Sequence, residues 1–192
     1  MSPVQLPAFV SRLLDQTREP GEVPAIPHSE AAGWLQPLAG SLLDWINAGL
    51  PGAPPEAFLA AGYAHLPLPA TDGQGLYLRL SCGSTWWTWP IAATSVVLTL
   101  AGAVDFEMYA QPGDARSSSP QYARSFGPEE AFAAHVGTLC ALRSRSYTMQ
   151  VLATKRPEPV PADGPRTLHH EDRVVFTKRA HRELELLVGG VR

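Results

Sequence analysis

Hydrophobic and polar positions follow two different periods along the chain. Over residues 6–14 and 34–46, apolar side chains recur every three or four positions, which is typical of amphipathic helices. After residue 73 the period changes to two, which favours β-strands. The pattern therefore predicts an N-terminal helical segment, residues 1–70, and a β-rich unit, residues 71–192, within a single compact body.

Three helices are expected in the first part of the chain. The first begins near Pro3, because proline suits the first helical position. The second begins near Ser29 and should kink at Pro37, where proline removes a backbone donor. A short third helix is expected over residues 55–61, with Gly62 ending it.

The strand candidates of the second part lie close together in the sequence. Most are too close for a helical crossover, so an antiparallel sandwich or barrel is expected. Residues 129–135 fit either a short helix or a loop and strand. The expected fold class is therefore mainly β, an antiparallel barrel with an N-terminal helical annex. The segments that carry the strand pattern are residues 76–80, 94–100, 104–109, 147–153, 173–178 and 184–188.

The composition argues against several kinds of partner and location. The 192 residues include 15 basic and 18 acidic ones, a formal charge of −3, which argues against a nucleic-acid-binding surface. The longest apolar run, residues 91–104, is too short and too polar to span a membrane. Cys82 and Cys140 make no disulfide framework and fit a reducing compartment. Since the start lacks a signal-peptide pattern, a cytoplasmic location is expected.

The spacing of several residues resembles the motifs of the cupin superfamily. The first cupin motif frames two histidines and a glutamate between glycines, and its positions correspond here to Gly83, Trp89, Ile91, Ser95 and Gly102. The second motif corresponds to His135, Gly137, Cys140 and Ser144. The resemblance covers residues 76–153, and the helical N-terminus is similar to that of cysteine-dioxygenase-like cupins. It implies that the barrel is a cupin-like jelly roll.

The resemblance also implies that the usual cupin metal ligands are replaced. Metal-binding cupins use the two histidines, the glutamate and a histidine of the second motif. The corresponding residues here are Trp89, Ile91, Ser95 and Cys140. Trp and Ile have no lone pair for a metal, Ser is a poor ligand, and one thiolate does not make a site. We therefore expect no metal and no cofactor.

The tryptophan-rich segment over residues 85–90 suggests a binding wall. On a strand, Trp87 and Trp89 share one face, and in a jelly roll that face lines the mouth of the barrel. Indole rings there suit an aromatic ring or a cation, although packing alone would also explain them. The first hypothesis is a metal-free, cupin-like protein that binds a small, partly aromatic or apolar organic ligand, for example as an accessory or tailoring protein. The expected ligand-binding residues are Trp87, Trp89, Tyr77, Arg79, Cys140 and Arg145.

Two enzymatic alternatives remain open, and no catalytic residue is assigned. One is a metal-independent isomerase, epimerase or cyclase that uses a His–Tyr acid–base pair. The candidate pairs are His65 with Tyr63 or Tyr77, and His135 with Tyr147. The other is a thiol-dioxygenase-like metalloenzyme with a remade site. It requires convergence of at least three of His135, His169, His170, Glu171 and His181.

A homodimer is expected from the end of the chain. If residues 173–188 form two edge strands, their exposed backbone amides favour pairing with a second chain. Alternatively, both strands complete the barrel of one chain. The apolar seam of such an interface would be Val174, Phe176, Leu184, Leu186 and Val188.

Overall fold

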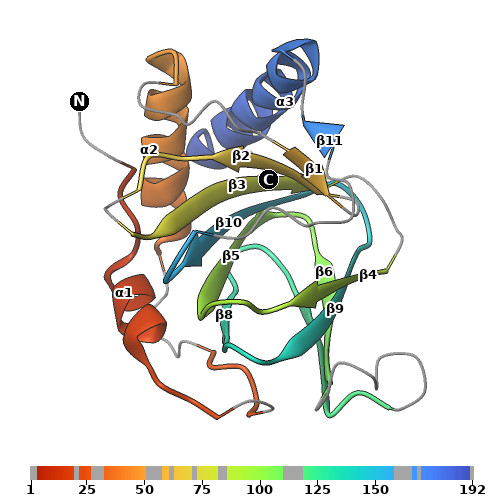
Figure 1. Cartoon of the computed structure of the whole chain (residues 1–192). Coiled ribbons are helices and arrows are strands. Elements are labelled where there is room, and N and C mark those ends of the chain that lie inside the picture. The colour runs from red at the N-terminus through yellow and green to blue at the C-terminus, as the bar shows by residue number, and fades with distance from the viewer. Residues whose placement is uncertain are drawn as a thin grey trace.

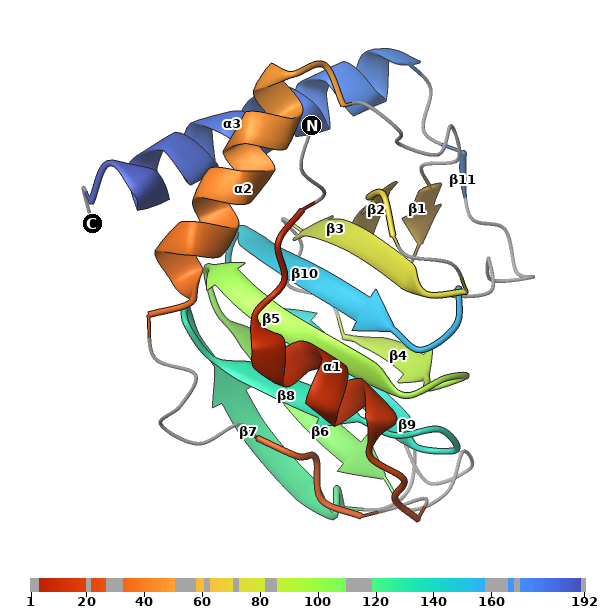
Figure 2. The same cartoon turned by 90° about the vertical axis from the view of Figure 1, so that its left-hand side faces the viewer.

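The structure is a computed structural model and describes residues 4–19, 22–26, 33–50, 58–60, 63–70, 73–81, 86–109, 119–157, 166–167 and 170–190. Its helices are α1 (Ala8–Asp15), α2 (Leu35–Asn47) and α3 (His170–Val188). Its strands are β1 (Phe58–Ala60), β2 (Tyr63–Pro67), β3 (Gly75–Ser81), β4 (Trp87–Pro90), β5 (Ser95–Ala101), β6 (Val104–Tyr109), β7 (Tyr122–Phe126), β8 (Ala131–Ala134), β9 (Leu139–Ser144), β10 (Thr148–Thr154) and β11 (Arg166–Thr167). Two antiparallel sheets face each other, and the helices lie on the outer side of the larger sheet (Figure 1, Figure 2).

The strand order identifies the fold. The larger sheet runs β11-β1-β2-β3-β10-β5-β8 and the smaller sheet runs β4-β9-β6-β7. When β3 to β10 are numbered one to eight, the two sheets read 1-8-3-6 and 2-7-4-5, which is the double Greek key of a jelly roll. The predicted fold class, a mainly β, cupin-like antiparallel jelly roll with an N-terminal helical annex, is confirmed.

The larger sheet is buried on both faces, which creates two hydrophobic cores. On β3, Leu78 packs among the helices, whereas Tyr77 faces the space between the sheets. That barrel interior is filled largely by a phenylalanine cluster, in which Phe132 lies 4.6 Å from Phe106 and 4.5 Å from Phe126 between ring centres. Apolar packing of this kind closes much of the barrel and leaves polar side chains on only part of its wall.

The C-terminal segment is a helix, so the strands predicted over residues 173–178 and 184–188 are wrong. No Gly or Pro interrupts the 19 residues of α3. The apolar positions that decide its conformation recur every four residues, and of these Ala180 and Leu184 are fully buried against the helical layer while Phe176 packs beside them. The predicted edge-strand seam is therefore absent. Of its remaining residues, three are more than one-third exposed on the helix: Val174, Leu186 and Val188.

Three other expectations change in the N-terminal part. The segment predicted as a third helix, residues 55–61, includes strand β1 instead. Strands β1 and β2, which both precede residue 70, pair into the larger sheet. The helical segment and the barrel therefore do not separate at residue 70. Helix α2 begins at Leu35, so Pro37 lies in its first turn, where the missing N–H has no helical partner to lose and no kink is needed. The expected helix start at Ser29 lies outside the described residues.

The described elements bear on two further expectations. Of the two possibilities for residues 129–135, the strand is correct, since β8 pairs with β5. Among the described helices, none combines the length and the apolar character needed to cross a membrane.

Candidate functional site

A row of buried polar side chains crosses the barrel face of the larger sheet. His65 on β2 is the register partner of Arg79 on β3, and Arg79 is in turn the partner of Gln150 on β10. Gln150 is the partner of Thr99 on β5, and its Nε2 donates a hydrogen bond of 3.3 Å to the Thr99 hydroxyl. Each of the four residues is at most 3% exposed. Polar groups are seldom buried together without a specific use, so this row marks the candidate site.

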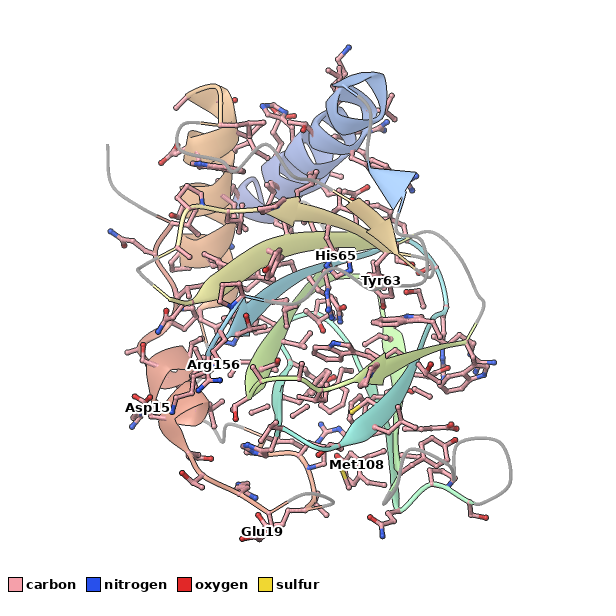
Figure 3. The ribbon with its side chains drawn as sticks, in the orientation of Figure 1. Asp15, Glu19, Tyr63, His65, Met108 and Arg156 are labelled. Atoms are coloured by element: carbon pink, nitrogen blue, oxygen red, sulfur yellow. The ribbon has the colours of Figure 1, made fainter. Side chains whose placement is uncertain are left out.

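Aromatic side chains surround one end of this row. We call the following residues the barrel cluster: Tyr63, His65, Tyr77, Arg79, Trp87 and Trp89. Figure 3 shows Tyr63 and His65 directed from β2 into the space between the sheets. Trp87 and Trp89 approach from β4 in the opposite sheet, two residues apart and therefore on the same strand face.

The Arg79 guanidinium lies among the aromatic rings of the cluster. Its central carbon is 4.3 Å from the centre of the Trp89 ring, 5.7 Å from that of Trp87 and 5.9 Å from that of Tyr63. These distances place the cation within the range of cation–π attraction, which is strongest for indole and for desolvated sites. Arg79 is completely buried, so its charge acts in a low-dielectric environment.

His65 is held in its neutral form by its surroundings. The Nε of Arg79 donates a hydrogen bond of 3.4 Å to Nδ1 of His65. Burial first, and the Arg79 charge second, hold the pKa of His65 well below its ordinary value of 6.5. Because Nδ1 accepts a hydrogen bond, the ring proton of neutral His65 resides on Nε2, and that nitrogen is a donor.

Tyr63 closes the end of the cluster. Its ring meets that of Trp87 edge to face, with 4.7 Å between centres. Its hydroxyl accepts a hydrogen bond of 3.1 Å from Ser144, whose hydroxyl is also 2.9 Å from that of Thr148. Burial raises the pKa of Tyr63, so the phenol stays protonated at neutral pH.

The structure brings together four of the six predicted ligand-binding residues. Trp87, Trp89, Tyr77 and Arg79 all belong to the barrel cluster. Cys140 lies opposite Trp89 on β9, wholly buried among apolar side chains, and burial raises the pKa of its thiol well above the usual value. It therefore contributes a small neutral surface.

Arg145, the sixth predicted residue, lies outside the barrel. Its guanidinium donates to Asp105, with 2.8 Å between Nε and Oδ1, and its side chain is 61% exposed. Arg143 binds the other Asp105 oxygen, and Ser125 donates to Asp105 as well. This network covers the outer face of the smaller sheet, so Arg145 does not contact the barrel cluster.

Gln150 and Thr99 are part of the polar row but were not predicted. Both occur at every-second positions within strongly apolar strands, and Gln150 stands between Met149 and Val151. A polar side chain on the inward face of a buried strand is the signal that would have identified them.

The residues at the cupin metal positions do not fit a metal. The side chains of Trp89 and Ile91 belong to the apolar core of the barrel. The Ser95 hydroxyl donates to the carbonyl of Ala93 at 2.7 Å, and Cys140 holds a neutral thiol. Over the described ranges, no three His, Cys, Asp or Glu side chains gather as a metal site requires.

Of the other histidines, the structure describes the side chains of His135 and His181, and neither joins the barrel cluster. His135 follows β8 at the sheet end marked by Ser95 and Thr154, whereas Tyr147 precedes the opposite end of β10 and lies under Arg179 of α3. The predicted His135–Tyr147 pair is therefore wrong.

The residues predicted for a remade metal site also lie in different parts of the fold. His181 forms a 2.8 Å contact with Asn47 of α2, in the helical layer outside the barrel, and so lies far from His135 in the fold. His170 and Glu171 begin the same helix, α3, and His169 lies outside the described residues.

A separate hollow lies on the helical side of the molecule. Its volume is about 570 Å³, and it is bounded mainly by α2. Its lining consists of Gln5, Pro37, Gly40, Ser41, Asp44, Trp45 and Ala48. The larger sheet stands between this hollow and the barrel cluster.

Comparison with known proteins gives similarity at the level of the fold. Neither the models of known protein families nor the curated proteins match this sequence. The similar solved structures include a cupin superfamily protein from Desulfitobacterium hafniense DCB-2, with 12% identity over 52% of this chain and 84% of that one, at a TM-score of 0.39. They also include the hydroxypropylphosphonic acid epoxidase of S. wedmorenis, with 9% identity over 54% and 55% of the two chains, at a TM-score of 0.44.

A third similar structure is a putative ethanolamine utilization protein Q from Salmonella typhimurium LT2. It shares 5% identity over 50% of this chain and 71% of that one, at a TM-score of 0.41. A cupin superfamily protein is thus among the similar solved structures. The assignment of the jelly roll itself rests on the strand order.

Proposed function

We propose that the barrel binds a small, partly aromatic or apolar organic molecule without the help of a metal. One observation supports this most strongly: a completely buried arginine, Arg79, lies against two tryptophan rings beside a buried polar row. Flat apolar walls combined with a few oriented polar groups are the usual features of small-molecule sites. The metal-free part of the proposal is supported by the residues at the positions of the cupin metal ligands, which do not suit a metal ion.

Binding fits the cluster better than acid–base catalysis does. A histidine base must accept a proton during the reaction, and its pKa is best placed near the working pH. The pKa of His65 is held well below its ordinary value, and the acceptor nitrogen already receives a hydrogen bond from Arg79. His65 is therefore suited to donating a hydrogen bond from Nε2.

Tryptophan fluorescence tests the binding proposal. A panel of aromatic and aliphatic metabolites is titrated into wild-type protein and into the Trp89→Phe and Trp34→Phe variants. Trp34 serves as the matched control, because it is also buried but lies in the helical layer. We expect at least one compound to shift the emission of the wild type and of Trp34→Phe, and to have a much smaller effect on Trp89→Phe. Equal responses of both variants, or no response to any compound, would contradict the proposal.

Metal analysis tests the remaining part of the proposal. Protein purified without a chelating tag is expected to contain far less than one equivalent of iron, nickel or zinc per chain. One equivalent that survives chelation would contradict a metal-free barrel.

A metal-independent isomerase, epimerase or cyclase is the second candidate. One observation favours it: the His65 ring lies 6.5 Å from that of Tyr63 and 6.2 Å from that of Tyr77, between centres. If a turnover is found, replacing an acid–base histidine in His65→Gln should reduce kcat by roughly 10²–10⁴-fold. An unchanged kcat would exclude His65 as the base.

Two broader expectations are retained as proposals. The cytoplasmic location is based on the cysteine content, which fits a reducing compartment. The homodimer is retained with its interface at or near the C-terminal segment, now a helix, and its test is given in the Discussion.

A further inference from the structure

We propose that protonation of His135 releases residues 22–26 from the edge of the larger sheet, so that acid opens this edge. We call residues 22–26 the edge segment. The change lies outside the barrel cluster and does not depend on the proposed ligand. It follows from three features: the backbone pairing at the sheet edge, the burial of His135 without hydrogen-bond partners, and the charges beside it.

The edge segment covers β8, which is the last strand of the larger sheet. Ala25 pairs antiparallel with Ala133: the Ala133 N–H donates to the Ala25 carbonyl at 2.8 Å, and the Ala25 N–H donates back at 3.1 Å. In the described part of the chain this bridge is isolated and does not extend into a ladder, so few backbone hydrogen bonds oppose release. Release would leave the Ala133 backbone groups unpaired at a strand edge, where another strand can pair with them.

His135 lies beside this bridge and is buried without hydrogen bonds. It follows Ala133 by two residues, and only 2% of it is exposed. Within the described residues, neither Nδ1 nor Nε2 of its ring has a hydrogen-bond partner. A buried polar group without a partner is costly, and most such groups in folded proteins are satisfied. Opening the edge would hydrate the imidazole, so His135 itself favours release.

The charges near His135 make the closed form sensitive to acid. Burial first and the Arg18 charge second lower the pKa of His135, whereas the Glu22 charge raises it. Arg18 and Glu22 lie together, with 3.9 Å between Nη1 and Oε2. The chain around the histidine, residues 131–138, has no charged residue, and neither has the adjoining loop 91–94, which hydrogen-bonds to it. An imidazolium here would be buried beside a guanidinium, with Glu22 as the opposing charge.

The direction of the pH effect follows from the two forms. In the open form His135 meets water and titrates near its ordinary pKa of 6.5, whereas in the closed form its pKa is lower. The open form therefore binds the proton more tightly, and the opening equilibrium rises as the pH falls. The rise is about 10-fold for each pH unit below 6.5, until the pKa of the closed form is reached.

Amide hydrogen exchange, measured by NMR on the whole chain, tests the release. The exchange rates of Ala25 and Ala133 are measured between pH 7.5 and pH 5 and corrected for the intrinsic effect of pH. We expect the protection of both amides to fall by about 10-fold for each pH unit below 6.5, while the amides of the central strand β10 stay far better protected. Constant protection, or a fall that merely matches global unfolding in β10, would overturn the proposal.

The His135 ring provides a direct second measurement on the wild type. Its NMR titration should give an apparent pKa below 6.5, and a value at or above 6.5 would overturn the proposal.

Variants then assign the effect to His135. The His135→Phe variant keeps an aromatic ring that cannot titrate, so its Ala25 protection should not depend on pH. His181→Gln, the control in the helical layer, should show the full fall. Arg18→Gln removes the opposing cation and should show a smaller fall. An equal fall in His135→Phe and the wild type would overturn the proposal, and if this variant fails to fold, Arg18→Gln and the wild-type ring titration decide.

Discussion

Arg79 donates a hydrogen bond to His65, its register partner on the neighbouring strand, and both side chains are buried. An arginine cation tolerates a buried imidazole at this distance only when the imidazole is neutral, because two buried positive charges would repel each other. At neutral pH the stable pair is therefore a charged Arg79 beside a neutral His65. Lowering the pH favours protonation of His65 and so destabilises the pair.

Acid should destabilise the protein through His65. Its pKa is lowered in the folded state, so the unfolded chain binds more protons below pH 6.5, and stability falls as the pH falls. The expected loss is about 1.4 kcal/mol per pH unit below pH 6 for this one group. His135, whose pKa burial also lowers, contributes with the same sign. Urea unfolding between pH 8 and pH 5 measures the slope.

The His65→Gln variant identifies the source of that slope. It should flatten the pH dependence, whereas His181→Gln, in the helical layer, should leave it unchanged. A slope that is equally steep in His65→Gln would show that other groups cause the acid sensitivity.

Asp105 should stabilise the protein well above its pKa. Hydrogen bonds from Arg145 first, then from Ser125 and Arg143, hold the pKa of its carboxyl well below the ordinary value, although partial burial opposes them. The folded state therefore favours the carboxylate, and its contribution is present at neutral pH and is lost as the pH falls below 4. Asp105→Asn should lower the unfolding free energy at pH 7 by about 1.5–3 kcal/mol.

A surface pair provides the control for Asp105. Asp15 lies 3.6 Å from Lys155, and both side chains are more than half exposed, so Asp15→Asn should change the unfolding free energy by less than about 1 kcal/mol. Equal effects of the two variants in urea unfolding at pH 7 would contradict a special role of the Asp105 network.

Gly102 should not tolerate a side chain. It turns the chain between β5 and β6 with φ of +74°, and a Cβ there would overlap the backbone oxygen of Tyr147. Gly102→Ala should lower the unfolding free energy by about 2–4 kcal/mol, since strain and overlap add. Gly73→Ala is the matched control, because Gly73 also has a positive φ, +80°, but its Cβ would meet no atom within 4 Å. Gly73→Ala should lower the unfolding free energy by about 1 kcal/mol in the same urea experiment.

The protein is expected to sediment as a homodimer. Helix α3 exposes Val175 and Leu186, which are 64% and 42% accessible, and two copies that meet at this end would cover them. Sedimentation at micromolar concentration should give twice the 20.7 kDa mass of the chain. The Leu186→Asp variant should shift the protein to the monomer, and Val136→Asp, a similarly exposed position beyond β8, should not. A wild-type monomer would exclude the dimer, and a dimeric Leu186→Asp would place the interface elsewhere.

Local patterns were sufficient for most of the barrel. Residues 104–109 were predicted as a strand and form β6 with the same bounds, and β3, β5 and β10 differ from their predictions by one residue at each end. Strands of this kind are readable because burial of one or both faces imposes a period of two on neighbouring positions. The same rule correctly put Trp87 and Trp89 on one face.

The C-terminal segment shows where local patterns were insufficient. Short stretches such as residues 174–176 alternate, and the alternation suggests a strand. The period of four that joins Phe176, Ala180 and Leu184 becomes decisive only when another layer buries those three positions. Helix α2 and the larger sheet supply that layer, so the tertiary structure chose the helix.

The sequence by itself determined the class of fold and the alternation of inward and outward positions along the barrel strands. Only the tertiary structure decided which inward residues meet. Strand register puts His65 beside Arg79, and the closure of the two sheets brings Trp89 onto the same guanidinium. Arg145 carries the same guanidinium group as Arg79. It lies just after the end of β9, however, and its side chain binds Asp105 outside the barrel. Side-chain chemistry is a property of each residue, whereas a site requires residues distant in the chain to share one space, and that depends on the packing of the whole molecule.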